Sequence, residues 1–286
     1  MRCLVTGAGG LLGTELVSWL RAQGEEVVGW DLPQHDVSDI EGTVNGIHRV
    51  GPELVFHLAA WSDVDGCEGD PGKAAAVNFQ GTWAVALGCA EVGSKLVYVS
   101  TDYVFDGRKG KPYRENDEPN PLSVYGRTKL MGEKAVVRSC RRHFIIRTSW
   151  LFGPHGRNFV DTIRRLASEK ERIEVVNDQF GSPTYAVHLC RPLREIAGST
   201  RYGIYHLTNS GYCSWWELAV KVVEFTGANC EVVPVESARL GRPAARPAFS
   251  VLENRNFRRR FGHELRPWQE VVESYVKGTP AAPTCR

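Results

Sequence analysis

The stretch Thr6-Gly7-Ala8-Gly9-Gly10-Leu11-Leu12-Gly13 decides the fold of this chain of 286 residues. It follows an apolar segment, residues 3–6, that is typical of a strand, and it opens a segment in which leucines recur at helical spacing. Gly7, Gly10 and Gly13 let the backbone turn tightly, approach a pyrophosphate and pack a helix close to a sheet. The spacing is G-x-x-G-x-x-G rather than the general G-x-G-x-x-G. The strand–turn–helix setting therefore carries the prediction of a phosphate-binding turn.

Outward from this turn, short apolar segments alternate with segments of helical pattern. Further strands are predicted at 27–30, 54–58, 97–100 and 144–148, and a helix around 74–90. Because the strands are apolar and alternate with helices, we expect an α/β fold with a doubly wound parallel sheet.

After about Gly153 the alternation becomes irregular. Helices are predicted near 158–167, 185–197 and 215–225, and strands near 173–176 and 205–207. We expect a nucleotide-binding core over 1–153 and a smaller, discontinuous substrate-binding lobe over 154–278, with some segments returning to the core. The tail, 279–286, is expected to be disordered.

Composition and charge exclude several classes of protein. Lys and Arg number 35 against 33 Asp and Glu, and this net charge of +2 gives no argument for a nucleic-acid partner. Hydrophobic residues make up 42% of the chain, which excludes a disordered protein, and the apolar runs are too short to cross a membrane. The chain begins with a strand rather than a signal peptide, and its eight cysteines form no C-x-x-C pair, so we expect a cytoplasmic protein.

Asp31 ends the second predicted strand, where an acidic residue can bind the adenosine ribose of a dinucleotide. The next residue is Leu32 rather than an arginine that could pair with a 2′-phosphate. This favours NADH over NADPH.

Two further motifs carry chemistry. Tyr125 and Lys129 in YGRTK share one face of a helix, and a cation together with the charged ring of an oxidised nicotinamide lowers the pKa of a phenol. Thr101 in VSTDYVF follows an apolar strand at the carboxyl edge of the sheet, where ligands bind in open α/β folds. Thr101 and Tyr125 could together bind a substrate carbonyl oxygen.

The chain resembles the extended short-chain dehydrogenase/reductase superfamily. It has the motifs of that superfamily in the same order: TGxxGxxG, a hydroxyl residue after the fourth strand, and YxxxK. The chain is also similar to the dTDP-4-dehydrorhamnose reductase family, and the matching stretches span most of it. They are HLAAWSDVDGCE (57–68), VNFQGT (77–82), STDYVFDG (100–107), NPLSVYGRTKLMGE (120–133), RTSWLFG (147–153), NF (158–159) and VVNDQFGSPT (175–184).

The resemblance implies a Rossmann core and a role for each matching residue. Tyr125 would donate a proton, Lys129 would lower its pKa and hold a ribose, and Thr101 would polarise the C4 carbonyl. The residues implied in contact with NADH or NADPH are Gly7, Gly10, Leu11, Leu12, Gly13, Asp31, Asp36, Val37, Ala59, Ala60, Tyr125 and Lys129. Those implied in contact with the sugar or its phosphates are Val64, Asp102, Tyr103, Trp150 and Asn158.

Residue chemistry supports three contacts with a nucleotide sugar. The flat apolar ring of Trp150 suits one face of a deoxyhexose. The guanidinium forks of Arg242 and Arg246 suit an anionic diphosphate. Some relatives hold Mg²⁺ through acidic residues at a dimer interface. Glu15 stands at one such place, but His188 replaces an Asp at another, and the histidines form no close ligand pair, so no metal is predicted.

These observations predict an NAD(P)H-dependent reductase of a nucleotide-activated 4-keto-6-deoxysugar, with dTDP-L-rhamnose as the expected product and a homodimer kept open. A ketoreductase for another dTDP-deoxysugar or for dihydrostreptose remains an alternative. An epimerase or a 4,6-dehydratase is another, although Tyr103 replaces the second acid that a dehydratase pairs with the Asp after its Thr. From a different class, a non-catalytic regulatory subunit would keep the fold. The intact set of Thr101, Tyr125, Lys129 and Asp31 argues against that last alternative.

Overall fold

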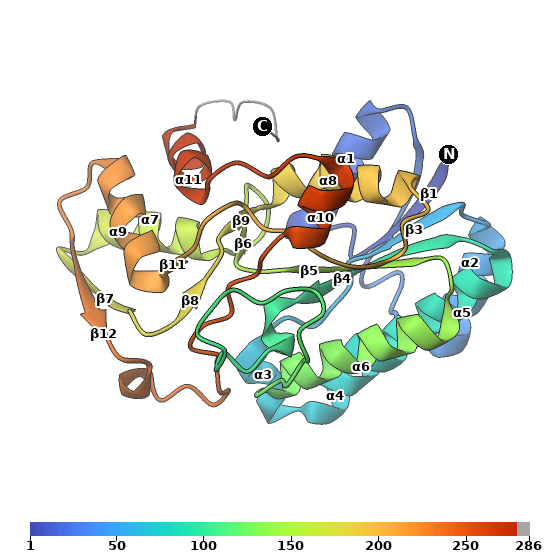
Figure 1. Cartoon of the computed structure of the whole chain (residues 1–286), viewed down its shortest axis with the longest axis horizontal. Coiled ribbons are helices and arrows are strands. Elements are labelled where there is room, and N and C mark those ends of the chain that lie inside the picture. Colours follow the sequence, from blue (N-terminus) through green and yellow to red (C-terminus); the bar gives the residue numbers. More distant parts are fainter. Residues whose placement is uncertain (279–286) are drawn as a thin grey trace.

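A sheet forms the centre of the molecule (Figure 1). Its six strands are parallel and lie in the order β10-β5-β4-β3-β1-β2. The computed structural model describes residues 1–278. The strands are β1 Arg2–Thr6, β2 Glu26–Trp30, β3 Leu54–His57, β4 Lys95–Thr101, β5 His143–Thr148 and β10 Gly203–His206. All four residues of β3 are buried, as expected for a parallel strand that is covered on both faces.

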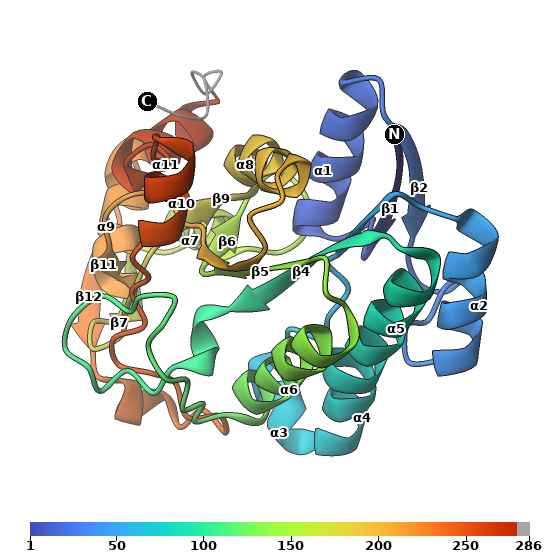
Figure 2. The ribbon, with the colours of Figure 1, turned by 45° about the vertical axis from the view of Figure 1, so that its right-hand side comes forward.

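Helices cover both faces of this sheet (Figure 2). On one face, α1 (Leu11–Ala22) packs against α8 (Ala186–Gly198), and on the other α2 (Ile40–Val50), α5 (Thr82–Val92) and α6 (Val124–Ser139) lie side by side. The connection from β3 to α5 contains α3 Val64–Gly69, α4 Pro71–Ala75 and the π-helical turn η1 Ala76–Gly81. A 3₁₀ turn, η2 Asp102–Val104, follows β4.

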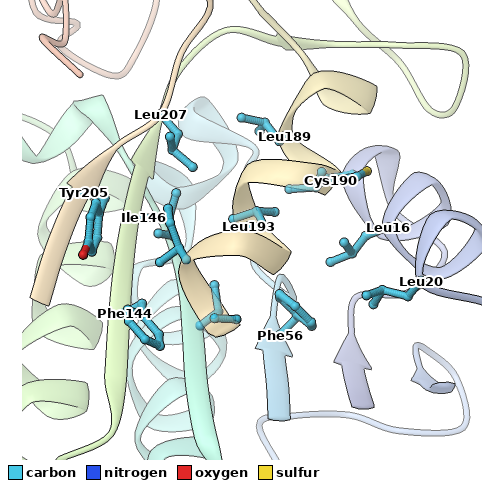
Figure 3. Packing of buried hydrophobic residues seen from close by; sticks show 14 of the residues in the cluster. Leu16, Leu20, Phe56, Phe144, Ile146, Leu189, Cys190, Leu193, Tyr205 and Leu207 are labelled. Carbon is cyan, nitrogen blue, oxygen red and sulfur yellow. The ribbon is translucent and has the colours of Figure 1, made fainter. Parts of the chain in front are cut away.

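The core between the sheet and the first pair of helices is apolar and closely packed. Leu16 and Leu20 of α1 and Leu193 of α8 are fully buried, and they lie over Phe56 and Phe144 of the sheet (Figure 3). Burying each such side chain stabilises the fold by roughly 1.5–3 kcal/mol. This packing fixes α1, and with it the glycine-rich turn, at the carboxyl end of β1.

A second lobe stands beside one end of the sheet (Figure 1). It contains three strand pairs: β6 Leu151–Phe152 with β9 Thr184–Tyr185, β7 Arg172–Val176 with β12 Glu231–Val235, and β8 Phe180–Gly181 with β11 Cys213–Ser214. Its helices are α7 Phe159–Glu169, α9 Trp215–Thr226 and α11 Trp268–Lys277, which share a separate apolar cluster. The remaining elements are two short ones, the 3₁₀ turn η3 Ser237–Leu240 and the helix α10 Arg255–Phe261.

The predicted α/β class and the parallel, doubly wound sheet are confirmed. The strand predicted at 205–207 appears as β10 and pairs with β5, so the second half of the chain returns to the sheet. The helix expected around 74–90 is divided among α4, η1 and α5, and α10 and α11 carry helical structure that the sequence analysis did not predict. Residues 279–286, predicted to be disordered, lie outside the described part of the chain. Within that part, no helix is both long and apolar enough for a membrane span.

Candidate active site

A cleft of about 840 Å³ opens at the carboxyl ends of the central strands. The segments that follow β1, β2, β3, β4 and β5 all contribute to its wall, and Trp215 of α9 lines it from the second lobe. In open α/β sheets this edge is where ligands bind. The wall includes all twelve predicted cofactor residues: Gly7, Gly10, Leu11, Leu12, Gly13, Asp31, Asp36, Val37, Ala59, Ala60, Tyr125 and Lys129.

The glycine-rich turn is built for close backbone approach. Gly7 has a φ of +68°, and a Cβ there would lie 2.7 Å from the backbone nitrogen of Ala59. A Cβ on Gly13 would overlap with the carbonyl oxygen of Gly7. The turn closes through a hydrogen bond from the Gly10 nitrogen to the Gly7 oxygen (3.1 Å), and α1 then begins at Leu11. These features fit a dinucleotide pyrophosphate held against a helix N-terminus.

Asp31 links the end of β2 to this turn. Its carboxylate accepts hydrogen bonds from the backbone nitrogens of Gly9 (2.5 Å) and Leu32 (2.8 Å). His35 stacks on Trp30 beside it, with ring centroids 4.6 Å apart. Asp31 thus lies where it can accept hydrogen bonds from ribose hydroxyl groups.

The three predicted catalytic residues all line the cleft. Thr101 ends β4, while Tyr125 and Lys129 lie one turn apart on α6. The hydroxyl of Ser123 caps this helix by accepting from the Gly126 nitrogen (3.1 Å), which fixes the turn that carries Tyr125. The Lys129 ammonium donates to the Val99 carbonyl oxygen (2.7 Å) and lies 4.2 Å from the centre of a tyrosine ring, that of Tyr98.

Burial dominates the electrostatics of this set. It raises the pKa of Tyr125, and a hydrogen bond with Thr101 acts in the opposite direction. It lowers the pKa of Lys129 to about 7, while the neighbouring Glu133 acts in the opposite direction. A lowering of the Tyr125 pKa by Lys129 together with the charged ring of an oxidised nicotinamide stays a prediction.

Asp102 extends the polar set into the protein. It is 2% exposed, and its carboxyl accepts hydrogen bonds from the Thr101 hydroxyl (3.1 Å) and from the Ser250 hydroxyl. Burial raises its pKa to about 7, and the hydrogen bonds from Ser250 and Thr101 oppose this shift. The hydroxyl groups of Thr101 and Ser250 both donate to the Asp102 carboxyl, and Thr101 also interacts with Tyr125 in the direction that lowers the Tyr125 pKa.

Trp150 lies on the far side of the cleft in a constrained position. Its φ of +48° is in the left-handed region, which is uncommon for a residue with a side chain. Its ring stacks on that of Trp215, with centroids 3.5 Å apart and an interplanar angle of 7°, and a Cβ on Gly181 would overlap with it. Trp215 is not predicted from the sequence, because 65 residues separate it from Trp150 and only the WW pair at 215–216 marks it.

Three predicted substrate residues do not line the cleft of this structure. Asn158 caps α7 by accepting from the Asp161 nitrogen (2.9 Å). Arg242 and Arg246 form ion pairs with Asp65 of α3, at 3.1 and 2.9 Å, and mainly through Arg246 these contacts lower the pKa of Asp65 to about 2. Val64, Asp102, Tyr103 and Trp150 do line the cleft. The roles assigned to all seven residues stay predictions.

The two residues at the positions where relatives bind Mg²⁺, Glu15 and His188, contact other side chains in this structure. Glu15 pairs with His155 (3.2 Å), and the buried His188 contacts Asn209 (3.3 Å). Across residues 1–278, no group of three or more His, Cys, Asp or Glu side chains is arranged to hold a metal ion.

Comparison with known proteins places the chain in a family. A family model described as the RmlD substrate binding domain matches residues 1–280. The chain belongs to this family. Several relatives of this chain are named dTDP-4-dehydrorhamnose reductase, so the resemblance drawn from the sequence motifs is confirmed.

Individual relatives in the RmlD family match nearly end to end. The Streptomyces griseus dTDP-4-dehydrorhamnose reductase is 39% identical, with 95% of this chain and 91% of that protein covered. The Bacillus subtilis spore coat polysaccharide biosynthesis protein SpsK is 37% identical, with 98% and 99% covered. A Bacillus anthracis dTDP-4-dehydrorhamnose reductase, crystallised in complex with NADP, is 37% identical with a TM-score of 0.93, covering 97% of this chain and 99% of that one.

Proposed function

We propose that this chain is an NAD(P)H-dependent reductase that converts dTDP-4-dehydro-L-rhamnose to dTDP-L-rhamnose. The observation that carries the proposal is the convergence of Thr101, Tyr125 and Lys129 on the cleft that also holds the glycine-rich turn. The names of its relatives support the choice of substrate. A cytoplasmic location is proposed with it, on the sequence argument alone.

The dinucleotide, when bound, supplies a hydride for C4 of the sugar. The chain's residues do the rest. Gly7, Gly10 and Gly13 hold the pyrophosphate, and Asp31 accepts from the adenosine ribose. With the sugar bound, the Thr101 hydroxyl turns from Asp102 and donates its hydrogen bond to the C4 oxygen, while Tyr125 delivers the proton that converts this oxygen to a hydroxyl.

Lys129 and Asp102 control the proton at Tyr125. The buried ammonium of Lys129 favours the phenolate that remains when the proton has left. After the product leaves, the protonated Asp102 carboxyl can donate to the Thr101 oxygen while the Thr101 hydroxyl donates its own proton to the Tyr125 phenolate, and Asp102 then takes a proton from water, because its pKa is near neutrality. A proton acceptor and donor with such a pKa is efficient at neutral pH.

The aromatic pair and the arginines suit the two ends of the sugar nucleotide. The stacked Trp150 and Trp215 present an apolar wall to the deoxyhexose. Arg242 and Arg246 would exchange Asp65 for the diphosphate. Exposed ion pairs contribute little stability, so the exchange at the 59%-exposed Arg242 costs little.

The test is turnover of dTDP-4-dehydro-L-rhamnose by the wild-type chain and by Tyr125→Phe. Loss of the proton donor should lower kcat by at least about a hundredfold while the Kd of NADH stays within about twofold. Tyr202→Phe, a phenol remote from the cleft, is the matched control. Near-full activity of Tyr125→Phe would overturn the proposed mechanism, and cofactor binding without turnover by the wild type would favour a regulatory subunit.

A further inference from the structure

The loop 153–158 brings the second lobe into contact with the glycine-rich turn. It runs from β6 to α7, and it reaches the first residue of α1, Leu11. A Cβ on Gly156, whose φ is +74°, would lie 3.6 Å from the Leu11 Cβ and 3.8 Å from the Leu11 backbone nitrogen. The loop therefore passes so close to the helix N-terminus that would carry the pyrophosphate that a side chain at Gly156 would reach it.

Contacts on both sides hold this loop in place. On the sheet side, His155 pairs with Glu15 of α1 (3.2 Å). On the lobe side, the Gly153 carbonyl oxygen accepts hydrogen bonds from the Asn158 amide (2.9 Å) and from the Tyr275 hydroxyl (2.8 Å). The segment between these contacts is fixed over α1, and it contains one cation, Arg157.

Arg157 lines the cleft together with Gly9, Gly10 and Leu11. Within residues 1–278 its exposed guanidinium makes no hydrogen bond or ion pair. The other cations of the cleft are engaged: Lys129 donates to a backbone oxygen, and the Lys73 ammonium lies 4.5 Å from the centre of the Trp61 ring. An unpaired guanidinium fork beside a helix N-terminus is suited to a phosphate anion.

We propose that Arg157 binds the pyrophosphate of the dinucleotide, together with the backbone N–H groups of the glycine-rich turn. This inference rests on the proposed function. A nucleotide sugar also carries a diphosphate, but the close passage of Gly156 to Leu11 places the neighbouring Arg157 at the cofactor end of the cleft. The second lobe thereby contributes a charge to cofactor binding as well as a wall to the substrate site.

The experiment measures the Kd of NADH and of dTDP separately, by calorimetry, for the wild type, Arg157→Ala, Arg157→Lys and Arg165→Ala. Arg165 is the matched control, because it is an exposed arginine of α7 that pairs with Glu169 and lies outside the cleft wall. A lost charge-assisted hydrogen bond should weaken NADH binding by roughly tenfold to a hundredfold in Arg157→Ala. Arg157→Lys should lose less NADH affinity than Arg157→Ala. In both variants the Kd of dTDP and the midpoint of thermal unfolding should not change.

Unchanged NADH affinity in Arg157→Ala would overturn the inference. A loss of dTDP affinity with NADH affinity intact would also overturn it, because it would assign Arg157 to the diphosphate of the sugar nucleotide. If the wild type binds NADH but reduces no sugar, the proposed function fails while the effect of Arg157→Ala on NADH affinity still decides the inference. A wild-type chain that binds neither NADH nor NADPH overturns both.

Discussion

Asp102 is a residue of the site whose charge the fold controls. Its carboxyl is buried beneath the cleft between Thr101 and Ser250, and burial raises its pKa to about 7. The unfolded chain would release this proton near pH 4. Between these two values the folded chain therefore binds more protons than the unfolded chain, and its stability falls as the pH rises.

Asp102→Asn tests this account of the buried carboxyl. Between pH 5 and pH 8 the free energy of unfolding of the wild type should fall, through this group, by about 2–3 kcal/mol, and this part of the fall should be absent from the variant. Urea unfolding at the two pH values measures it. Asp106→Asn is the control, because hydrogen bonds, mainly from the Arg108 backbone, lower the pKa of Asp106 and place its titration below this range. Equal pH dependence in the wild type and Asp102→Asn would contradict the account.

Residues of the site differ in how well the sequence predicts them. Tyr125 and Lys129 share a helix face, and Gly7 and Gly13 belong to one turn, so local spacing reveals them. Trp215 and Arg157 reach the cleft only through the packing of the second lobe. No local pattern records such long-range contacts.

At the scale of elements, three segments meet around one indole ring. Trp150 leaves β5 with a φ of +48°, α9 brings Trp215 against one face, and β8 brings Gly181 close to the ring. A side chain at Gly181 would displace the ring, because its Cβ would overlap with indole atoms. The proposed sugar site thus depends on a glycine in a strand.

Gly181→Ala should raise the KM for the nucleotide sugar by at least about tenfold and lower the free energy of unfolding by about 1–3 kcal/mol. The change in Trp150 packing should also alter the intrinsic tryptophan fluorescence. Gly69→Ala on α3 is the control, since nothing lies within 4 Å of a Cβ at that position. An unchanged KM in Gly181→Ala would remove Trp150 from the sugar site.

The elements of the sheet follow from the sequence because each central strand is a short, continuous apolar run. The course of the connection over residues 64–92 does not follow from the sequence pattern, because it depends on contacts of buried side chains. Asn78 in the π-helical turn accepts from the Trp61 nitrogen (2.8 Å) and donates to the Trp61 oxygen (3.1 Å). This contact across 17 residues holds a turn that helical periodicity alone predicts as part of one straight helix.

At the scale of the whole molecule, the cleft lies where the two lobes meet. The sheet supplies the glycine-rich turn, Asp31 and the catalytic set, and the second lobe supplies Trp215 and the loop with Arg157. Sequence patterns predict the strands of the sheet, but they predict the elements of the second lobe only roughly. The strands of this lobe are short and pair across long stretches of chain, such as β7 with β12.

The side of the cleft near Asp31 also bears on the choice of cofactor. The residues of the cleft wall there are Asp31, Leu32, His35, Asp36 and Val37, which include no Lys or Arg. A 2′-phosphate would face the carboxylate of Asp31 with no guanidinium to bind it. We therefore expect a lower KM for NADH than for NADPH. The Asp31→Ala variant should show a smaller difference between these two KM values.

One coupled assay tests the central claim most directly. The chain is given dTDP-4-keto-6-deoxyglucose with and without a 3,5-epimerase, and the oxidation of NADH and of NADPH is followed separately. The account predicts oxidation only in the presence of the epimerase, with NADH the better cofactor. Oxidation without the epimerase would mean that the chain makes a different deoxysugar, and no oxidation in any mixture, with NADH still bound, would contradict the proposed reductase.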